Sequence, residues 1–177
     1  ISVIRQDGSG NVLNQIKVPL AYGPKQKFLS RLDSITGQDA TMAIKLPRMG
    51  FEITSMDIDS TQKLAKRNQI VENHATDSTK KKTIKQAVAY NINMSLFAMA
   101  KNQDDGLQIM EQILPYFQPE YTVTINPVTG FDYKQDVPII LNAVTIQDDY
   151  EGDFQTRRAL IYQFDFVMKM KYFGPTA

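Results

Sequence analysis

The chain has 177 residues, 42% hydrophobic and 22% charged, which is typical of one folded domain and excludes a disordered or collagen-like chain. It has no cysteine and a single histidine, His74, which excludes disulfides, cysteine-based catalysis, zinc fingers and two-histidine metal sites within one chain. The net charge is only +1 and no apolar run approaches the roughly 18 residues that span a bilayer, so we expect neither a general nucleic-acid binder nor a membrane protein.

The first sixty residues predict two hairpins and one helix. Gly8 and Gly10 fit the turn of the first hairpin better than a phosphate loop, because no Gly-Lys-Ser/Thr follows them. Pro24 opens a helix that runs to about residue 36, because apolar side chains recur there at helical spacing. Alternating apolar residues predict the strands, which are 2–6 with 12–20, and 41–46 with 51–58 across a turn at 47–50.

The next segment, about 59–83, is long and polar and has no sustained apolar stripe. A loop of this length within a compact domain is usually a functional arm or disordered, so we expect an arm that orders against a partner. The alternative is that two strand ends extend into a long hairpin. On either interpretation His74 is a solvated residue, because no second ligand type lies near it in the sequence.

The second half of the chain predicts one helix among four strands. The helix spans about 104–114, with Asp104 and Asp105 near its positive end and Pro115 after it. Together the elements predict an α+β fold in a single domain, 1–177, made mostly of antiparallel sheets of about eight strands, with two helices packed on one side. The strands of this half are 84–100, 121–125, 137–146 and 158–172.

Charge is distributed unevenly along the chain. Residues 61–101 carry eight basic and two acidic side chains, a net charge of +6, whereas residues 102–153 carry one basic and ten acidic side chains, a net charge of −9. These two blocks either neutralise each other within the fold or attract each other between copies. The basic stretch 63–85 has no interleaved aromatic residues, so contact with a phosphate backbone would be non-specific.

No group of residues predicts catalysis, a cofactor or a metal. The acidic turn from Asp148 to Asp153 is the best candidate for a hard cation, but Gly152 stands at the wrong offset for an EF-hand loop and no glutamate follows at the twelfth position. A solvated acidic hairpin tip is the simpler interpretation. Nothing singles out two carboxylates for hydrolysis.

One stretch is distinctive: the helix ends in Ile113-Leu114-Pro115-Tyr116-Phe117-Gln118-Pro119 and a strand follows. This stretch resembles the tail sheath stabiliser and completion proteins, or tail terminators, of T-even-like contractile-tailed bacteriophages. The resemblance covers most of 15–172. Its other segments, in the same order, are Val18-Pro19-Leu20-Ala21-Tyr22, Leu46-Pro47-Arg48, Asp104-Asp105, and Asp153 with Arg157-Arg158.

The resemblance implies a structural virion protein and not an enzyme. It implies a hexameric ring that caps the tail tube and the last sheath ring, stabilises the sheath and presents the surface to which the neck of the filled head docks. The partners would be the sheath, the tube or its completion protein, and the head–neck connector, with genome DNA passing through the lumen without sequence-specific binding. The protein would assemble in the host cytoplasm and be located in the virion tail.

Two alternative functions stay open: another neck or tail adaptor of the same assembly, and a small carboxylate-dependent hydrolase. For the ring we predict a head-to-tail interface in which basic and acidic groups of adjacent copies meet. The candidate interface residues are Lys80, Lys81, Lys82, Asp148, Asp149, Glu151, Arg157 and Arg158. The candidate structural motif is Ile113, Leu114, Pro115, Tyr116, Phe117 and Pro119.

Overall fold

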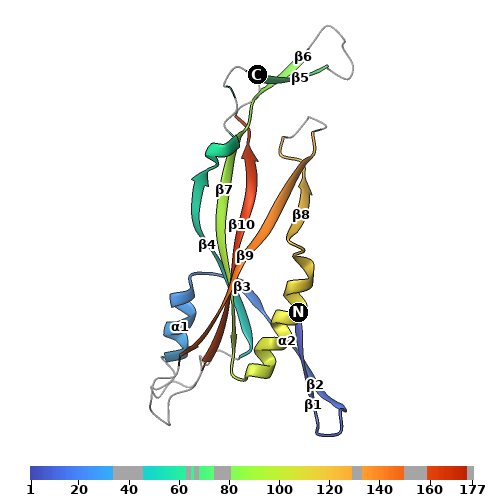
Figure 1. The fold of residues 1–177 in the computed structure, drawn as a ribbon, viewed down its shortest axis with the longest axis vertical. Coiled ribbons are helices and arrows are strands. Elements are labelled where there is room, and N and C mark those ends of the chain that lie inside the picture. The colour runs from blue at the N-terminus through green and yellow to red at the C-terminus, as the bar shows by residue number, and fades with distance from the viewer. Residues whose placement is uncertain are drawn as a thin grey trace.

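Six strands form one long, twisted sheet in the computed structural model of the chain (Figure 1). In the order β3-β4-β7-β10-β9-β8, all neighbours are antiparallel except β3 and β4, which are parallel. These strands are β3 (Leu20–Tyr22), β4 (Arg48–Ile58), β7 (Val88–Ala100), β8 (Glu120–Ile125), β9 (Gln135–Asp149) and β10 (Ala159–Tyr172). The structure describes residues 1–33, 46–62, 65, 68–73, 81–128, 133–149 and 159–174.

Two separate hairpins project from opposite ends of this sheet (Figure 1). One consists of β1 (Ser2–Gln6) and β2 (Val12–Lys17), and the other of β5 (Gln69–Asn73) and β6 (Lys81–Lys85). The second hairpin lies within the polar segment, beyond a short 3-10 turn, η3 (Ser60–Gln62), and is the hairpin that the sequence left open as an alternative. Whether this segment orders only against a partner stays a prediction.

The expected α+β class, with mostly antiparallel strands, is confirmed, although the described residues form ten strands rather than about eight. The expected strand 84–100 is wrong at its start, because the ladder breaks at Gln86 and Ala87 and residues 84–85 belong to β6. The expected turn at 47–50 is also wrong, because β4 begins at Arg48, which pairs with Met99. Residues 41–45 of the expected strand lie outside the described residues.

The two helices cover opposite faces of the sheet, not one side as expected. Helix α1 (Lys25–Asp33) places Phe28 against Phe97, with ring centroids 5.4 Å apart. Helix α2 (Gln103–Ile113) places Ile109 in a cluster with Ala98. Because Phe97 and Ala98 are adjacent in β7, their side chains point to opposite faces, and each face therefore receives its own helix.

Two glycines allow these helices and rings to approach the sheet. A Cβ atom at Gly106 of α2 would overlap the ring of Tyr162, with Cζ only 2.6 Å away. A Cβ atom at Gly50 of β4 would lie 2.5 Å from the ring of Phe97 and 3.0 Å from that of Phe28. Both positions therefore require a residue without a side chain for steric reasons, and neither backbone has a positive φ.

Two glutamines of α2 join the N-terminal hairpin to the rest of the molecule. Gln108 accepts a hydrogen bond from the Ile4 N–H at 2.8 Å and donates one to the Ile4 carbonyl at 3.0 Å. Gln112 makes the same pair with Ser2, at 3.1 and 2.7 Å. The four-residue spacing on the helix matches the two-residue spacing on β1, so each side-chain amide occupies the place of a peptide in a neighbouring strand.

Replacing Gln112 with Glu should loosen this junction. The carboxylate keeps an acceptor for the Ser2 N–H but loses the donor, and it faces the Ser2 carbonyl oxygen at hydrogen-bonding distance. We expect the free energy of opening of β1 to fall by about 1 to 2 kcal/mol, measured by amide hydrogen exchange at residues 2–6. Gln118→Glu, at an exposed position outside α2, is the matched control, and equal exchange in both variants would contradict the role of Gln112.

Candidate functional site

The α2 side of the long sheet is mostly apolar, with Gln135 and Asp148 as exceptions, but α2 covers only one end of it. Helix α2 has 11 residues and is therefore about 16 Å long, whereas the 13 residues of β7 span about 43 Å. We call the part beyond α2 the apolar face. It consists of Ile53, Met56, Ile58, Val88, Tyr90, Ile92, Met94, Tyr121, Val123, Val137, Ile139, Phe166, Met168, Met170 and Tyr172.

Much of the apolar face is open to solvent in the isolated chain. Ile58 is 65% exposed, Met56 51%, Val88 48% and Tyr121 47%. Most of the other exposed large apolar side chains on the sheet, such as Tyr22 of β3, continue the same face. A soluble monomer rarely exposes apolar patches of several hundred square ångströms that are not contact surfaces. This geometry therefore indicates a surface that a protein covers.

The opposite side of the sheet is polar at the same level. Asn93 donates hydrogen bonds of 2.8 Å to both Ser55 and Asp57, which come from the neighbouring strand. Ser95 donates a 2.7 Å hydrogen bond to Asp165, which also accepts one from Gln163 at 3.0 Å. These side chains of the polar face satisfy each other within the chain, so the sheet is amphipathic and its α2 side is the one that exposes apolar surface.

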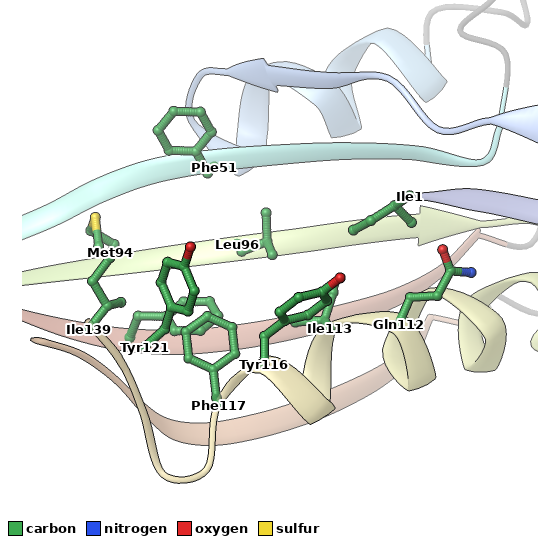
Figure 2. A pocket seen from close by; sticks show the side chains of 11 residues that line it. Ile1, Phe51, Met94, Leu96, Gln112, Ile113, Tyr116, Phe117, Tyr121 and Ile139 are labelled. Atoms are coloured by element: carbon green, nitrogen blue, oxygen red, sulfur yellow. The ribbon is translucent and has the colours of Figure 1, made fainter. Parts of the chain in front are cut away.

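A hollow of about 360 Å³ opens where the apolar face meets the end of α2. Figure 2 shows the sheet residues on one side of it and the helix with its exit on the other. Its walls are almost wholly apolar, so it suits an apolar or aromatic side chain of a partner rather than a polar ligand. The lining residues are Ile1, Phe51, Met94, Leu96, Gln112, Ile113, Tyr116, Phe117, Tyr121, Ile139 and Phe166.

The distinctive stretch 113–119 forms one wall of this hollow. Ile113 is buried, and Leu114 and Phe117 are partly buried against the core. Pro115 does not end the helical course at once, because the chain adds a 3-10 turn, η4 (Leu114–Tyr116), on which Tyr116 is 68% exposed. Pro119, an exposed residue, directly precedes β8.

Replacing Phe117 with Ala should destabilise the fold. Its ring lies 4.8 Å from that of Phe166 and 6.2 Å from that of Tyr121. Because Phe117 is only partly buried, we expect a loss of about 2 to 3 kcal/mol in the free energy of unfolding, at the lower end for an aromatic truncation. Tyr116→Ala is the matched control and should lower the free energy of unfolding by less than about 0.5 kcal/mol. Denaturant titration measures both losses, and equal losses would contradict the structural role of Phe117.

Of the predicted charged interface residues, the two whose side chains the structure describes, Lys81 and Asp148, lie far apart within one chain. Lys81 is exposed on β6, close to the Val88 end of β7, whereas Asp148 of β9 is on the rung of Leu160 and Ala100 at the other end. These ends of β7 are about 40 Å apart. For Lys82 and Asp149 the structure describes the backbone only, and Lys80, Glu151, Arg157 and Arg158 lie outside the described residues.

The described residues offer little to chemistry. They contain no group of three His, Cys, Asp or Glu side chains placed to hold a metal ion. None of the helices in that part of the chain is long and apolar enough to cross a membrane. Burial raises the pKa of the Tyr162 hydroxyl, and the charge of Asp148 adds to this effect, so this core tyrosine is neutral at ordinary pH.

Comparison with known proteins agrees with this geometry. The family of T4-like virus Myoviridae tail sheath stabilisers matches residues 1–177. The chain belongs to this family. It is also similar to the tail completion protein gp15 of Enterobacteria phage T4, with 29% identity over 182 aligned residues. That alignment covers 99% of the chain but 65% of the T4 protein, so the chain spans slightly less than two thirds of that relative's length.

As a tail sheath stabiliser, the chain is a structural protein of a contractile phage tail, and the tail is where it is located. The resemblance found in the stretch 113–119 and its flanking segments is thereby confirmed. The apolar face was not predicted from the sequence. The signal was present, since the alternation in 88–100 and 160–172 is much longer than any helix predicted to cover it.

Proposed function

We propose that this stabiliser forms a closed ring of identical copies, six by analogy with the resemblance described above, at the end of the tail. The ring caps the tube and the last sheath ring and presents the surface on which the neck of the head docks, while DNA passes through its lumen. The chain acts by binding and has no catalytic role in this proposal.

The observation that carries this proposal is the apolar face together with its hollow. Exposed apolar surface of this kind usually marks a protein contact, and the hollow offers a pocket of the type that anchoring side chains fill. Because the opposite face of the sheet is polar, the apolar face is the side that we expect a partner protein to cover. We infer that the apolar face binds the neighbouring proteins of the tail, the sheath and the tube.

Electron microscopy of the purified protein tests the ring directly. We expect closed rings of uniform diameter with a central lumen, and the same particles should bind to tails whose sheath lacks its terminal protein. A protein that stays monomeric at micromolar concentration, as measured by light scattering, would contradict the ring. Rings that bind a head connector but not a sheath would favour a neck adaptor instead.

The salt dependence of the ring distinguishes charged contacts between copies from shorter-range ones. The predicted pairing of Lys80, Lys81 and Lys82 with Asp148, Asp149 and Glu151 of the next copy stays a prediction, and it would need contacts between opposite ends of the molecule. Raising the salt from 0.1 to 1 M shortens the Debye length from about 10 to about 3 Å. If light scattering shows dissociation at 1 M, the charged pairing rather than a shorter-range contact holds the copies together.

A further inference from the structure

Both edges of the long sheet are unpaired over a comparable length. On one edge, β3 covers only residues 49–51 of β4, so residues 52–58 have no strand beside them among the described residues. On the other edge, β8 pairs with β9 alone. Figure 1 shows β4 and β8 at the two margins of the same part of the sheet. Six residues of β8 and seven residues of β4 therefore lie on open edges among the described residues.

The same edge of β4 binds a parallel strand within the chain just before its open part, at residues 49–51. Tyr22 of β3 pairs with Phe51 in parallel orientation, and the ladder stops there because β3 has only three residues. Four successive antiparallel steps separate β4 from β8, so these two strands run in the same direction. If a second copy stands beside the first in the same orientation, its β8 is parallel to β4 and continues the line of β3.

The two edges are also at the same level. Tyr121 of β8 pairs with Ile139, which pairs with Met168 of β10. Met168 pairs with Ile92, and Ile92 pairs with Met56 of β4. The pairings through the same three strands also place Glu120 level with Ser55. Adjacent copies can thus join β8 to β4 without shifting along the strands.

The side chains on the two edges match in this register. Tyr121 and Val123 lie on the apolar face, as do Met56 and Ile58. Glu120 lies on the polar face with Ser55. A slip of one residue would place apolar side chains opposite polar ones, so the alternation excludes odd shifts, and the common level of Tyr121 and Met56 singles out this register among the even ones.

From these observations we propose that β8 of one copy adds as a parallel strand to the open end of β4 in the next copy, with residues 120–123 beside residues 55–58, so that the sheets form one continuous ring. This inference rests on the proposed ring and specifies how its copies join. The occupant of the edge is a second copy of this chain, because only a strand of matching direction, level and alternation satisfies both edges at once. The apolar faces of the copies then form one uninterrupted belt.

Disulfide cross-linking tests the proposal sharply, because the chain has no cysteine of its own. In the double variant Met56→Cys/Tyr121→Cys the two thiols are four strand spacings apart within one chain, about 19 Å, which is too far for a bond. Between paired copies they lie on one rung and one face. Mild oxidation should convert most of the assembled protein into covalent oligomers on a denaturing gel, up to the full ring.

The matched control is Ser55→Cys/Tyr121→Cys. Its thiols are at nearly the same level but on opposite faces, and cross-linking should be at least tenfold weaker. Mixing the two single variants Met56→Cys and Tyr121→Cys should give covalent dimers, whereas each single variant alone should not.

The outcomes separate this proposal from the ring itself. Rings seen by electron microscopy without a link between positions 56 and 121, or with equal links in the control, overturn the edge pairing and leave the ring in place. Covalent open chains without rings support the edge pairing and overturn the closed ring. The absence of both links and rings overturns both.

Discussion

Replacing Gly106 with Ala should lower the free energy of unfolding by about 3 kcal/mol or more. The new Cβ atom would overlap the ring of Tyr162, whose side chain is 1% exposed and has no free space to move into. In an exposed helix the same substitution would stabilise by about 1 kcal/mol, so the sign of the effect is itself informative. Thermal and denaturant unfolding, followed by circular dichroism, give the measurement.

Two further variants make the Gly106 test specific. Gly8→Ala is the control, because no atom lies within 4 Å of a Cβ built there, and it should change stability by less than about 0.5 kcal/mol. Tyr162→Leu removes the ring atoms that the new methyl group meets, so Gly106→Ala should cost much less in that background. If the two losses simply add, the contact between positions 106 and 162 is not the cause.

Replacing Met170 with Lys should leave the subunit folded but raise the concentration needed to stabilise a sheath by at least about 30-fold, the equivalent of about 2 kcal/mol. Met170 is half-buried in the middle of the apolar face, opposite Tyr90. In the free subunit the lysine can extend its charge into water, but in a covered face the charge would be buried without a partner.

The assay supplies each variant to tails that lack their stabiliser and counts those whose sheath stays extended. Val167→Lys is the matched control, because Val167 is on the same strand and half-buried but lies on the polar face. It should behave as the unmodified protein does. An equal loss of sheath stabilisation in both variants would mean that the polar face is covered as well. If neither variant loses sheath stabilisation, the apolar face makes no contact with the sheath.

The sequence predicted the strands better than their assembly. Alternation in 88–100 and 158–172 placed most of β7 and β10 and showed which of their side chains share a face, because a period of two residues is a local property. It did not place the two helices on opposite faces. That outcome depends on Phe97 and Ala98, which both look like core residues in the sequence, each being buried by a different helix.

The candidate site was predicted in part. The stretch 113–119 was singled out and does line the hollow, because its composition is locally distinctive. The level of Met56 and Tyr121 could not be predicted, because it depends on four successive strand registers and on the irregularities at Ile53/Ser55 and Asp165/Phe166. The charge blocks were evident from composition, but that Lys81 and Asp148 lie at opposite ends of the sheet follows only from the length of β7.

The position of β10 at the centre of the sheet has a consequence for how the chain folds. On the ribosome β4 and β7 emerge early and can pair, but β10 is made after β9 and must insert between β7 and β9. Until residues 159–172 are available, the hairpin of β8 and β9 has no strand through which it can pair with the sheet of β4 and β7. Folding is therefore limited by pairings between distant parts of the chain, which typically take milliseconds to seconds. Strand edges and apolar side chains left unpaired during that delay are the features that make partly folded chains prone to aggregation.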